Sequence, residues 1–175
     1  FLTSQKKGIL ASEMGSGKTL AAIIAALEDN YKKVLIVCPA SVKMTWKKEL
    51  SLLVDEDDIT IVEGSEWKEN RFTIINYDIL KNFYEVPTET VKRKELNLDD
   101  DGNIVNVVKE KEVVSRKKYI ISNAMSKSQL YKSQFDLVII DEAHRLSNTS
   151  SGIFKIMTDL LDRSKPRGIY AITGT

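Results

Sequence analysis

Short apolar runs recur along the chain, and segments with helical spacing of apolar residues separate them. The runs are rich in β-branched residues and lack polar alternation, which is typical of strands buried on both faces of a parallel sheet. We expect strands at residues 8–11, 34–39, 59–62, 72–77, 135–140 and 168–173. We expect helices at residues 20–27, at 43–50 with Ser41 as the N-cap, at 78–83 and at 153–161. This alternation predicts an α/β fold, with a mainly parallel sheet and helices on both of its faces.

Polar clusters follow most of the predicted strands. They comprise residues 15–19, 39–41, 76–78, 141–144 and 173–175. In parallel α/β sheets, ligands bind at the carboxyl ends of the strands. We therefore expect these clusters to share one edge of the molecule and to form its functional site there.

One long stretch, residues 85–118, interrupts the alternation. It is rich in Lys, Glu and Asp, and it is far longer than the usual connection of about 2–6 residues. Residues 96–98 and 104–108 flank Gly102 and predict the two arms of an inserted β-hairpin. Its mixed charges are typical of a solvated surface. The alternative is a contact to a partner or to nucleic acid through two basic runs, at residues 92–94 and 116–118.

Size, charge and cysteine content narrow the class of protein. The 175 residues are 42% hydrophobic and 29% charged, which fits one domain with a sizeable core. The net charge of +1 gives no global attraction to nucleic acid, so such a site would have to be a local patch. The single cysteine, Cys38, excludes an internal disulfide and favours a reducing, intracellular compartment.

No membrane or secretion signal is visible in the sequence. No apolar run approaches the ~18 residues of a membrane span, and the N-terminus has no signal-peptide pattern. The chain begins at Phe1 without an initiator methionine and ends directly after a predicted strand. We interpret it as part of a longer protein.

A glycine-rich turn ending in Gly-Lys-Thr follows the first predicted strand and opens the first predicted helix. Gly15 and Gly17 would let successive N–H groups face one concavity, which binds phosphates at a helix N-terminus. Lys18 would reach the β- and γ-phosphates, and the Thr19 hydroxyl would hold Mg²⁺. The strict phosphate-loop pattern has glycine where this chain has Ser12; the alternative is a glycine-rich turn without a ligand. The predicted nucleotide-binding residues are Glu13, Met14, Gly15, Ser16, Gly17, Lys18 and Thr19.

An acidic pair, Asp141 and Glu142, stands where the fifth predicted strand ends. An aspartate in that position holds Mg²⁺, usually through water, and the adjacent glutamate polarises a water aligned on the γ-phosphate. Two solvated turn residues are the alternative. His144 is the only histidine, and we assign it to coupling or positioning rather than to proton transfer. No Cys/His cluster suggests zinc.

Taken together, five ordered motifs resemble those of the superfamily-2 helicases, and within them the Swi/Snf branch of DNA translocases. The motifs cover almost the whole chain outside residues 85–118. They are Ser12–Thr19, Val37–Glu49, Ile75–Asp78, Leu137–Asn148 and Ile172–Thr175. Two departures, Ser12 for the usual aspartate and Ser147 for the usual lysine, favour a bacterial or viral relative over chromatin remodellers proper.

The resemblance implies the N-terminal, three-layer RecA-like lobe of a phosphate-loop ATPase that uses ATP and Mg²⁺. Gly15, Gly17, Lys18 and Thr19 would bind the phosphates and the metal, and Asp141 and Glu142 would complete the hydrolytic site. The segments implied to lie along the nucleic-acid backbone are Pro39, Ala40 and Ser41 with Lys43 and Trp46, and Asn76, Tyr77 and Asp78. The segment implied to link hydrolysis to lobe movement is Thr173, Gly174 and Thr175. On physical grounds alone, we interpret Trp46 as core.

The implied partners are duplex DNA and a second RecA-like lobe. Backbone N–H groups and small hydroxyls such as Ser41 grip phosphates without reading bases, which predicts sequence-independent, salt-dependent binding. Without the arginine finger of the second lobe, a term worth roughly 10³–10⁵ in rate, the chain alone should hydrolyse ATP slowly. The alternative is a nucleotide-gated binding module that recruits a partner through residues 85–118. The intact Glu142 argues against it, because a pure binder needs no water-polarising carboxylate.

Overall fold

The computed structural model describes residues 6–11, 13, 15–64, 66–83, 90–98, 104–114, 130 and 133–174. The chain divides into two compact units. The first joins Phe1–Tyr84 with Lys127–Thr175, and the second is Glu85–Ser126. In the described part of the chain, no helix is both long and apolar enough to cross a membrane.

A six-stranded sheet forms the centre of the first unit, and every strand pair in it is parallel. The strands are β1 (Lys7–Ala11), β2 (Val34–Cys38), β3 (Ile59–Ile61), β4 (Phe72–Asn76), β7 (Leu137–Asp141) and β8 (Gly168–Thr173). Their spatial order is β1-β8-β7-β2-β4-β3. The expected parallel α/β sheet is therefore confirmed, and each predicted strand lies at its expected place in the chain.

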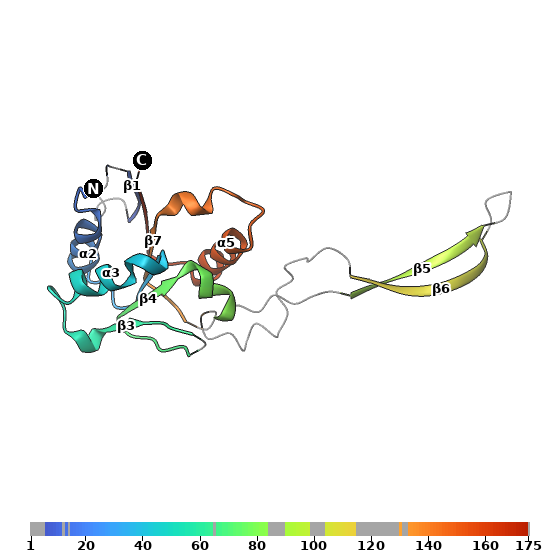
Figure 1. The fold of residues 1–175 in the computed structure, drawn as a ribbon, viewed down its shortest axis with the longest axis horizontal. Helices are drawn as coiled ribbons and strands as arrows, with labels where there is room; N and C mark the ends of the chain where they lie inside the picture. The colour runs from blue at the N-terminus through green and yellow to red at the C-terminus, as the bar shows by residue number, and fades with distance from the viewer. Residues whose placement is uncertain are drawn as a thin grey trace. The chain divides into compact units, whose positions relative to one another are not determined.

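Helices cover both faces of the sheet (Figure 1). α2 (Lys18–Glu28) and α3 (Lys43–Leu50) pack against each other on one face, and α5 (Gly152–Ser164) packs with the 3₁₀ segment η3 (Tyr77–Phe83) on the other. This division follows from topology. The connections from β1 to β2 and from β2 to β3 cross the sheet in one direction, whereas those from β4 to β7 and from β7 to β8 cross it in the other. Because connections of this kind are right-handed, the helices of the two sets lie on opposite faces. The predicted three-layer architecture is confirmed.

Alternate residues of the strands face the two helix layers, as the pleat requires. One core cluster joins Val34, Ile36 and Cys38 of β2 to α2 and α3, and all three are fully buried. Their neighbours Leu35 and Val37 are equally buried and point to the α5 layer. Burial on both faces explains why these strands show no polar alternation in the sequence.

The sequence placed the start of α3 incorrectly. Ser41 is not its N-cap, because residues Ala40–Val42 form a separate 3₁₀ turn, η1, that leads directly into the helix. α3 begins at Lys43, with Val42 as an N-cap that makes no side-chain hydrogen bond. A helical segment was correctly expected near residues 78–83, but it is the 3₁₀ segment η3.

The second unit contains an antiparallel pair, β5 (Thr90–Leu98) with β6 (Ile104–Val114). The pair contains both predicted arms of the hairpin, although each strand is longer than expected. The register shifts between Glu95 and Leu96 and again between Asn97 and Leu98. The predicted turn at Gly102 lies outside the described residues.

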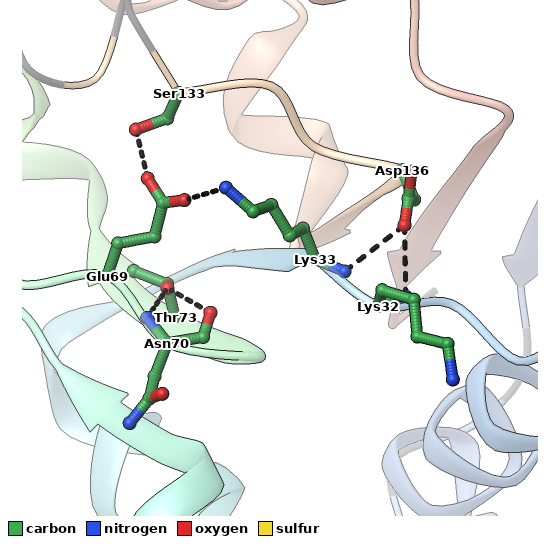
Figure 2. Close-up of polar contacts among 7 residues, drawn as sticks. All are labelled: Lys32, Lys33, Glu69, Asn70, Thr73, Ser133 and Asp136. Atoms are coloured by element: carbon green, nitrogen blue, oxygen red, sulfur yellow. Dashed lines mark hydrogen bonds and ion pairs between the residues drawn. The ribbon is translucent and has the colours of Figure 1, made fainter.

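A polar network ties together the amino ends of β2, β4 and β7 (Figure 2). The Asp136 carboxylate, just before β7, accepts hydrogen bonds from the backbone N–H groups of Lys32 and Lys33 at 3.0 and 3.2 Å. The Lys33 ammonium donates to Glu69 at 2.7 Å, and the Ser133 hydroxyl donates to the same carboxylate. The network therefore fixes the start of β7 against β2 and against the segment before β4.

We expect Gly168→Ala to lower the free energy of unfolding by about 1–3 kcal/mol, the usual cost of over-packing a core. A β-carbon at this position would lie 2.5 Å from the Tyr31 hydroxyl oxygen and 2.8 Å from Leu137 Cδ1. Tyr31 is 1% exposed and packs edge-on against Tyr170, so it has little room to move. Urea denaturation measures the effect. In a Tyr31→Phe background the cost should fall, because the closest obstacle is gone; an equal cost in both backgrounds would refute this explanation.

A second prediction concerns the pH dependence of stability. Burial alone would raise the pKa of Glu69, but the hydrogen bonds from Lys33 and Ser133 lower it below its ordinary 4.5. The stabilisation is therefore fully present above pH 4.5 and is lost as the pH falls through the lower, folded-state pKa. Glu69→Gln should cost about 1 kcal/mol at pH 7, and the difference from wild type should shrink in acid. Glu66→Gln, at an exposed position, is the control; a cost of Glu69→Gln that stays constant with pH would contradict the account.

Candidate active site

The predicted polar clusters do meet at one edge of the sheet. A cavity of about 350 Å³ opens there, between the carboxyl ends of the strands and helices α2 and α3. Its lining residues are Gly15, Ser16, Gly17, Lys18, Thr19, Val42, Thr45, Trp46, Glu49, Asp141, Glu142, Ile172 and Gly174. The glycine-rich turn and the acidic pair, far apart in sequence, thus line the same cavity.

The glycine-rich turn has the backbone of an anion-binding site. Gly15 and Gly17 have φ of 81° and 75°, in the left-handed region that favours glycine. A β-carbon at either position would meet nothing within 4 Å, so the backbone conformation, rather than space, requires glycine. Gly17 is the N-cap of α2 and supplies no side-chain acceptor, and the first turn of the helix has no acidic residue. The N–H groups at this helix end are therefore suited to an external anion.

Lys18 stands at the first position of α2 and extends over the turn. Its ammonium donates to the Glu13 carbonyl at 2.7 Å and lies 3.5 Å from the Ser16 hydroxyl. The positive charge is thus held beside the N–H groups and reinforces their attraction for an anion. Met14, one of the predicted nucleotide-binding residues, lies outside the described residues, as does Ser12 before it.

Asp141, the last residue of β7, is held by three hydrogen bonds. Its Oδ2 accepts from the indole Nε1 of Trp46 at 2.8 Å, and its Oδ1 accepts from the backbone N–H of Glu142 at 2.9 Å. Its backbone carbonyl accepts from the Tyr77 hydroxyl at 2.6 Å. Burial raises the pKa of Asp141, and the Glu142 charge adds to this, whereas the two hydrogen bonds to its carboxylate and the charge of Lys18 act against it.

Glu142 has a left-handed backbone, with φ 53° and ψ 50°, which is uncommon for a residue other than glycine. Its carboxylate lies 3.2 Å from Nδ1 of His144, and the same nitrogen lies 3.4 Å from the Thr173 hydroxyl of β8. His144 therefore stands between the acidic pair and the end of β8. The coupling role of His144 and Thr173 stays a prediction. Gly174 lines the cavity nearby, and Thr175 lies outside the described residues.

Sequence reasoning missed one side of the cavity, which α3 supplies. Trp46 and Glu49 are one turn apart, so they lie on the same face of α3, and both line the cavity. Burial raises the pKa of Glu49, and the nearby charge of Asp141 raises it further. Trp46 is 1% exposed, which confirms its interpretation as core, but its N–H is directed at Asp141. The sequence offered one signal for this placement. Trp46 and Glu49 have i, i+3 spacing in a helix that follows a strand whose carboxyl end lies at the ligand-binding edge of the sheet.

The predicted nucleic-acid residues fall into two groups. Ala40 and Ser41 are exposed, and Pro39 and Lys43 are half-buried, with the Lys43 ammonium donating to the Val62 carbonyl at 3.2 Å. In contrast, Asn76 and Tyr77 are only 6% and 1% exposed. The side chain of Asn76 donates to Asp78 at 3.3 Å, and Tyr77 donates to Asp141. The structure therefore gives no support to direct nucleic-acid contact by these two side chains, because the fold turns both inward.

The donor set of the cavity fits a magnesium nucleotide. Thr19 and Asp141 offer hydroxyl and carboxylate oxygens, the ligand type that Mg²⁺ prefers. The helix N-terminus and Lys18 offer N–H donors and positive charge for phosphates. Among the described residues, no group of three or more His, Cys, Asp or Glu side chains forms a separate metal cluster.

Comparison with known proteins identifies the family. The sequence model of the SNF2-related domain matches residues 2–175, and the chain belongs to this family. The chain is 28% identical over 173 residues to the ISWI chromatin-remodeling complex ATPase ISW1 of Saccharomyces cerevisiae, covering 96% of this chain and 12% of that protein. It is 29% identical over 178 residues to an uncharacterized ATP-dependent helicase of Mycoplasma genitalium, covering 98% of this chain and 13% of the relative.

Among solved structures, the SWI2/SNF2 ATPase core of Sulfolobus solfataricus in complex with dsDNA has a TM-score of 0.61 and 22% identity. The match covers 95% of this chain and 27% of that chain. It confirms the RecA-like fold expected from the motifs. The chain thus spans only a small part of the length of these relatives. Because both yeast and bacterial proteins are among them, the predicted bacterial or viral origin stays a prediction.

We expect Glu142→Gly to be more stable than Glu142→Ala by about 1 kcal/mol, because the left-handed region is costly for any residue with a β-carbon. Both variants lose the carboxylate equally, so the difference isolates the backbone. Chemical denaturation of the two proteins measures it. Ala143→Gly, one residue on and without a positive φ, is the control and should destabilise instead. If Glu142→Gly were less stable than Glu142→Ala, the left-handed backbone at this position would not be strained.

Proposed function

We propose that this chain is the ATP-binding lobe of a nucleic-acid-dependent ATPase, which couples ATP hydrolysis to movement along duplex DNA. The observation that carries the proposal is the meeting of the phosphate-binding turn with the acidic pair in one cavity. The exposed segment at Ala40 and Ser41 begins at the same edge of the sheet, directly after β2. The names of the relatives, an ISWI ATPase and a SWI2/SNF2 core with dsDNA, support the same activity.

In this function the turn at Gly15–Lys18 binds the triphosphate. The left-handed glycines direct backbone N–H groups toward the phosphate oxygens, and these donors need no rearrangement on binding. Lys18 supplies a full positive charge at the same place. Thr19 and Asp141 would hold Mg²⁺, which when bound neutralises phosphate charge.

Glu142 orients and polarises the attacking water in the proposed reaction. Glu142 directly follows β7, and its backbone conformation sets the direction in which its side chain projects. The carboxylate is then oriented by Nδ1 of His144, which lies 3.2 Å from it. Thr173 extends this contact to the end of β8 through Nδ1 of His144. A change in the charge of the nucleotide would therefore act on the series of contacts that joins Glu142, His144 and Thr173. This supports the proposed coupling role of these residues.

The DNA side of the lobe follows β2. Exposed backbone and the Ser41 hydroxyl would contact phosphates of the duplex, without reading bases. Asn76 and Tyr77 contribute by shaping this edge from within. The full reaction also needs a second RecA-like lobe, whose arginine would stabilise the transition-state charge. We assign residues 85–118 to an insertion within the lobe, in keeping with the separate unit at Glu85–Ser126.

The decisive test is the ATPase rate of the full-length protein that contains this chain. Rates are compared without nucleic acid and with duplex DNA, single-stranded DNA or RNA, beside a Glu142→Gln control. We expect strong stimulation by duplex DNA, weakened by salt and lost in the control. A rate indifferent to every nucleic acid would overturn the proposal. It would favour the nucleotide-gated module, in which residues 85–118 recruit a partner.

A further inference from the structure

Two aromatic side chains reach Asp141 from different elements of the fold. Trp46 comes from α3 and donates to the Oδ2 atom at 2.8 Å. Tyr77 opens η3 and donates to the backbone carbonyl at 2.6 Å. One bond orients the carboxylate and the other fixes the main chain that carries it. Rotation of the side chain and displacement of the strand end are therefore both restricted.

Burial makes these two hydrogen bonds strong and costly to break. Trp46 and Tyr77 are each 1% exposed, so water cannot replace either donor. A buried acceptor that loses its donor carries the full penalty of desolvation. Asp141 is itself partly buried, so the folded protein is more stable when both donors bond to this residue than when only one does.

Each donor is also directly connected to a segment that the sequence associates with nucleic acid. Trp46 lies one helical turn beyond η1, the turn containing Ala40 and Ser41, and η1 runs into α3 without a break. Tyr77 follows Asn76 at the end of β4. A shift of either segment would move a donor relative to Asp141. A tryptophan that merely filled the core would be satisfied by any nearby carbonyl, whereas this one is directed at a proposed metal ligand.

We propose that Trp46 and Tyr77 are positioning residues that connect the DNA-side segment after β2 and the inward-facing segment at the end of β4 to Asp141, so that contact with DNA adjusts the magnesium-nucleotide site through these two hydrogen bonds. This rests on the proposed function. The communication is short: each link is one hydrogen bond from the segment concerned. Outer hydrogen bonds of this kind to a metal ligand commonly change metal affinity or activity by about 10–100-fold.

The first test measures binding rather than turnover. Trp46→Phe and Tyr77→Phe remove one donor each and keep an aromatic ring in the core. Tyr31→Phe is the matched control, because Tyr31 is a tyrosine of equal burial at the opposite, amino-terminal edge of the sheet. A fluorescent ADP is titrated with Mn²⁺ in each protein, and its fluorescence reports the metal-nucleotide complex. We expect the apparent Mn²⁺ affinity to fall about 10-fold in Trp46→Phe, to fall in Tyr77→Phe, and to stay unchanged in Tyr31→Phe.

The second test measures stimulation by duplex DNA in the full-length protein with the same substitutions. We expect the ratio of stimulated to basal kcat to fall in both site variants and to match wild type in the control. If wild type is stimulated and both site variants keep its ratio and its Mn²⁺ affinity, the inference is overturned while the proposed function stands. If wild type ignores DNA, the proposed function fails and the link to DNA fails with it; the Mn²⁺ titration still decides whether the two aromatics position Asp141.

Discussion

The hydrogen bond from Trp46 to Asp141 is the interaction on which the arrangement of this edge depends. β7 is buried along Leu137–Ile140, and it ends in a carboxylate that burial pushes toward the neutral form. A charge in such a place is costly unless donors surround it. Trp46, the Glu142 N–H and Lys18 provide that environment. Because one donor belongs to α3, the helix cannot be displaced from the cavity without a penalty at Asp141.

The parallel sheet explains how distant segments reach this point. β1 and β7 are separated by β8, so the turn after β1 and the acidic pair after β7 flank the end of β8. That end carries Thr173, which contacts the ring of His144. On the other side of β7 lie β2 and β4, whose ends lead to Trp46 and Tyr77. Asp141 therefore lies between the nucleotide side and the proposed DNA side because of strand order alone.

Sequence reasoning found the strands and the motif geometry for physical reasons that are local. Doubly buried strands have no polar alternation, and a left-handed turn before a helix requires glycines such as Gly15 and Gly17. It failed where tertiary contacts decide. Periodicity shows that α3 has an apolar face but not that Trp46 and Glu49 line the nucleotide cavity, and it did not separate η1 from α3. Tyr77 was assigned to a nucleic-acid surface, whereas packing against the end of β7 buries it.

The backbone of Glu142 gives the edge its last constraint. Holding a non-glycine residue in the left-handed region costs about 1–2 kcal/mol, and a fold keeps such a residue only where its surroundings fix it. Here the Asp141 carboxylate accepts from the Glu142 N–H, and the backbone N–H of Arg145 donates to the Glu142 carbonyl at 3.0 Å. The carboxylate that Trp46 orients thus also stabilises the strained residue that carries the proposed water-polarising group. The orientations of Asp141 and Glu142 are consequently coupled. A movement of α3 or η3 that displaces the Asp141 carboxylate must therefore also displace Glu142.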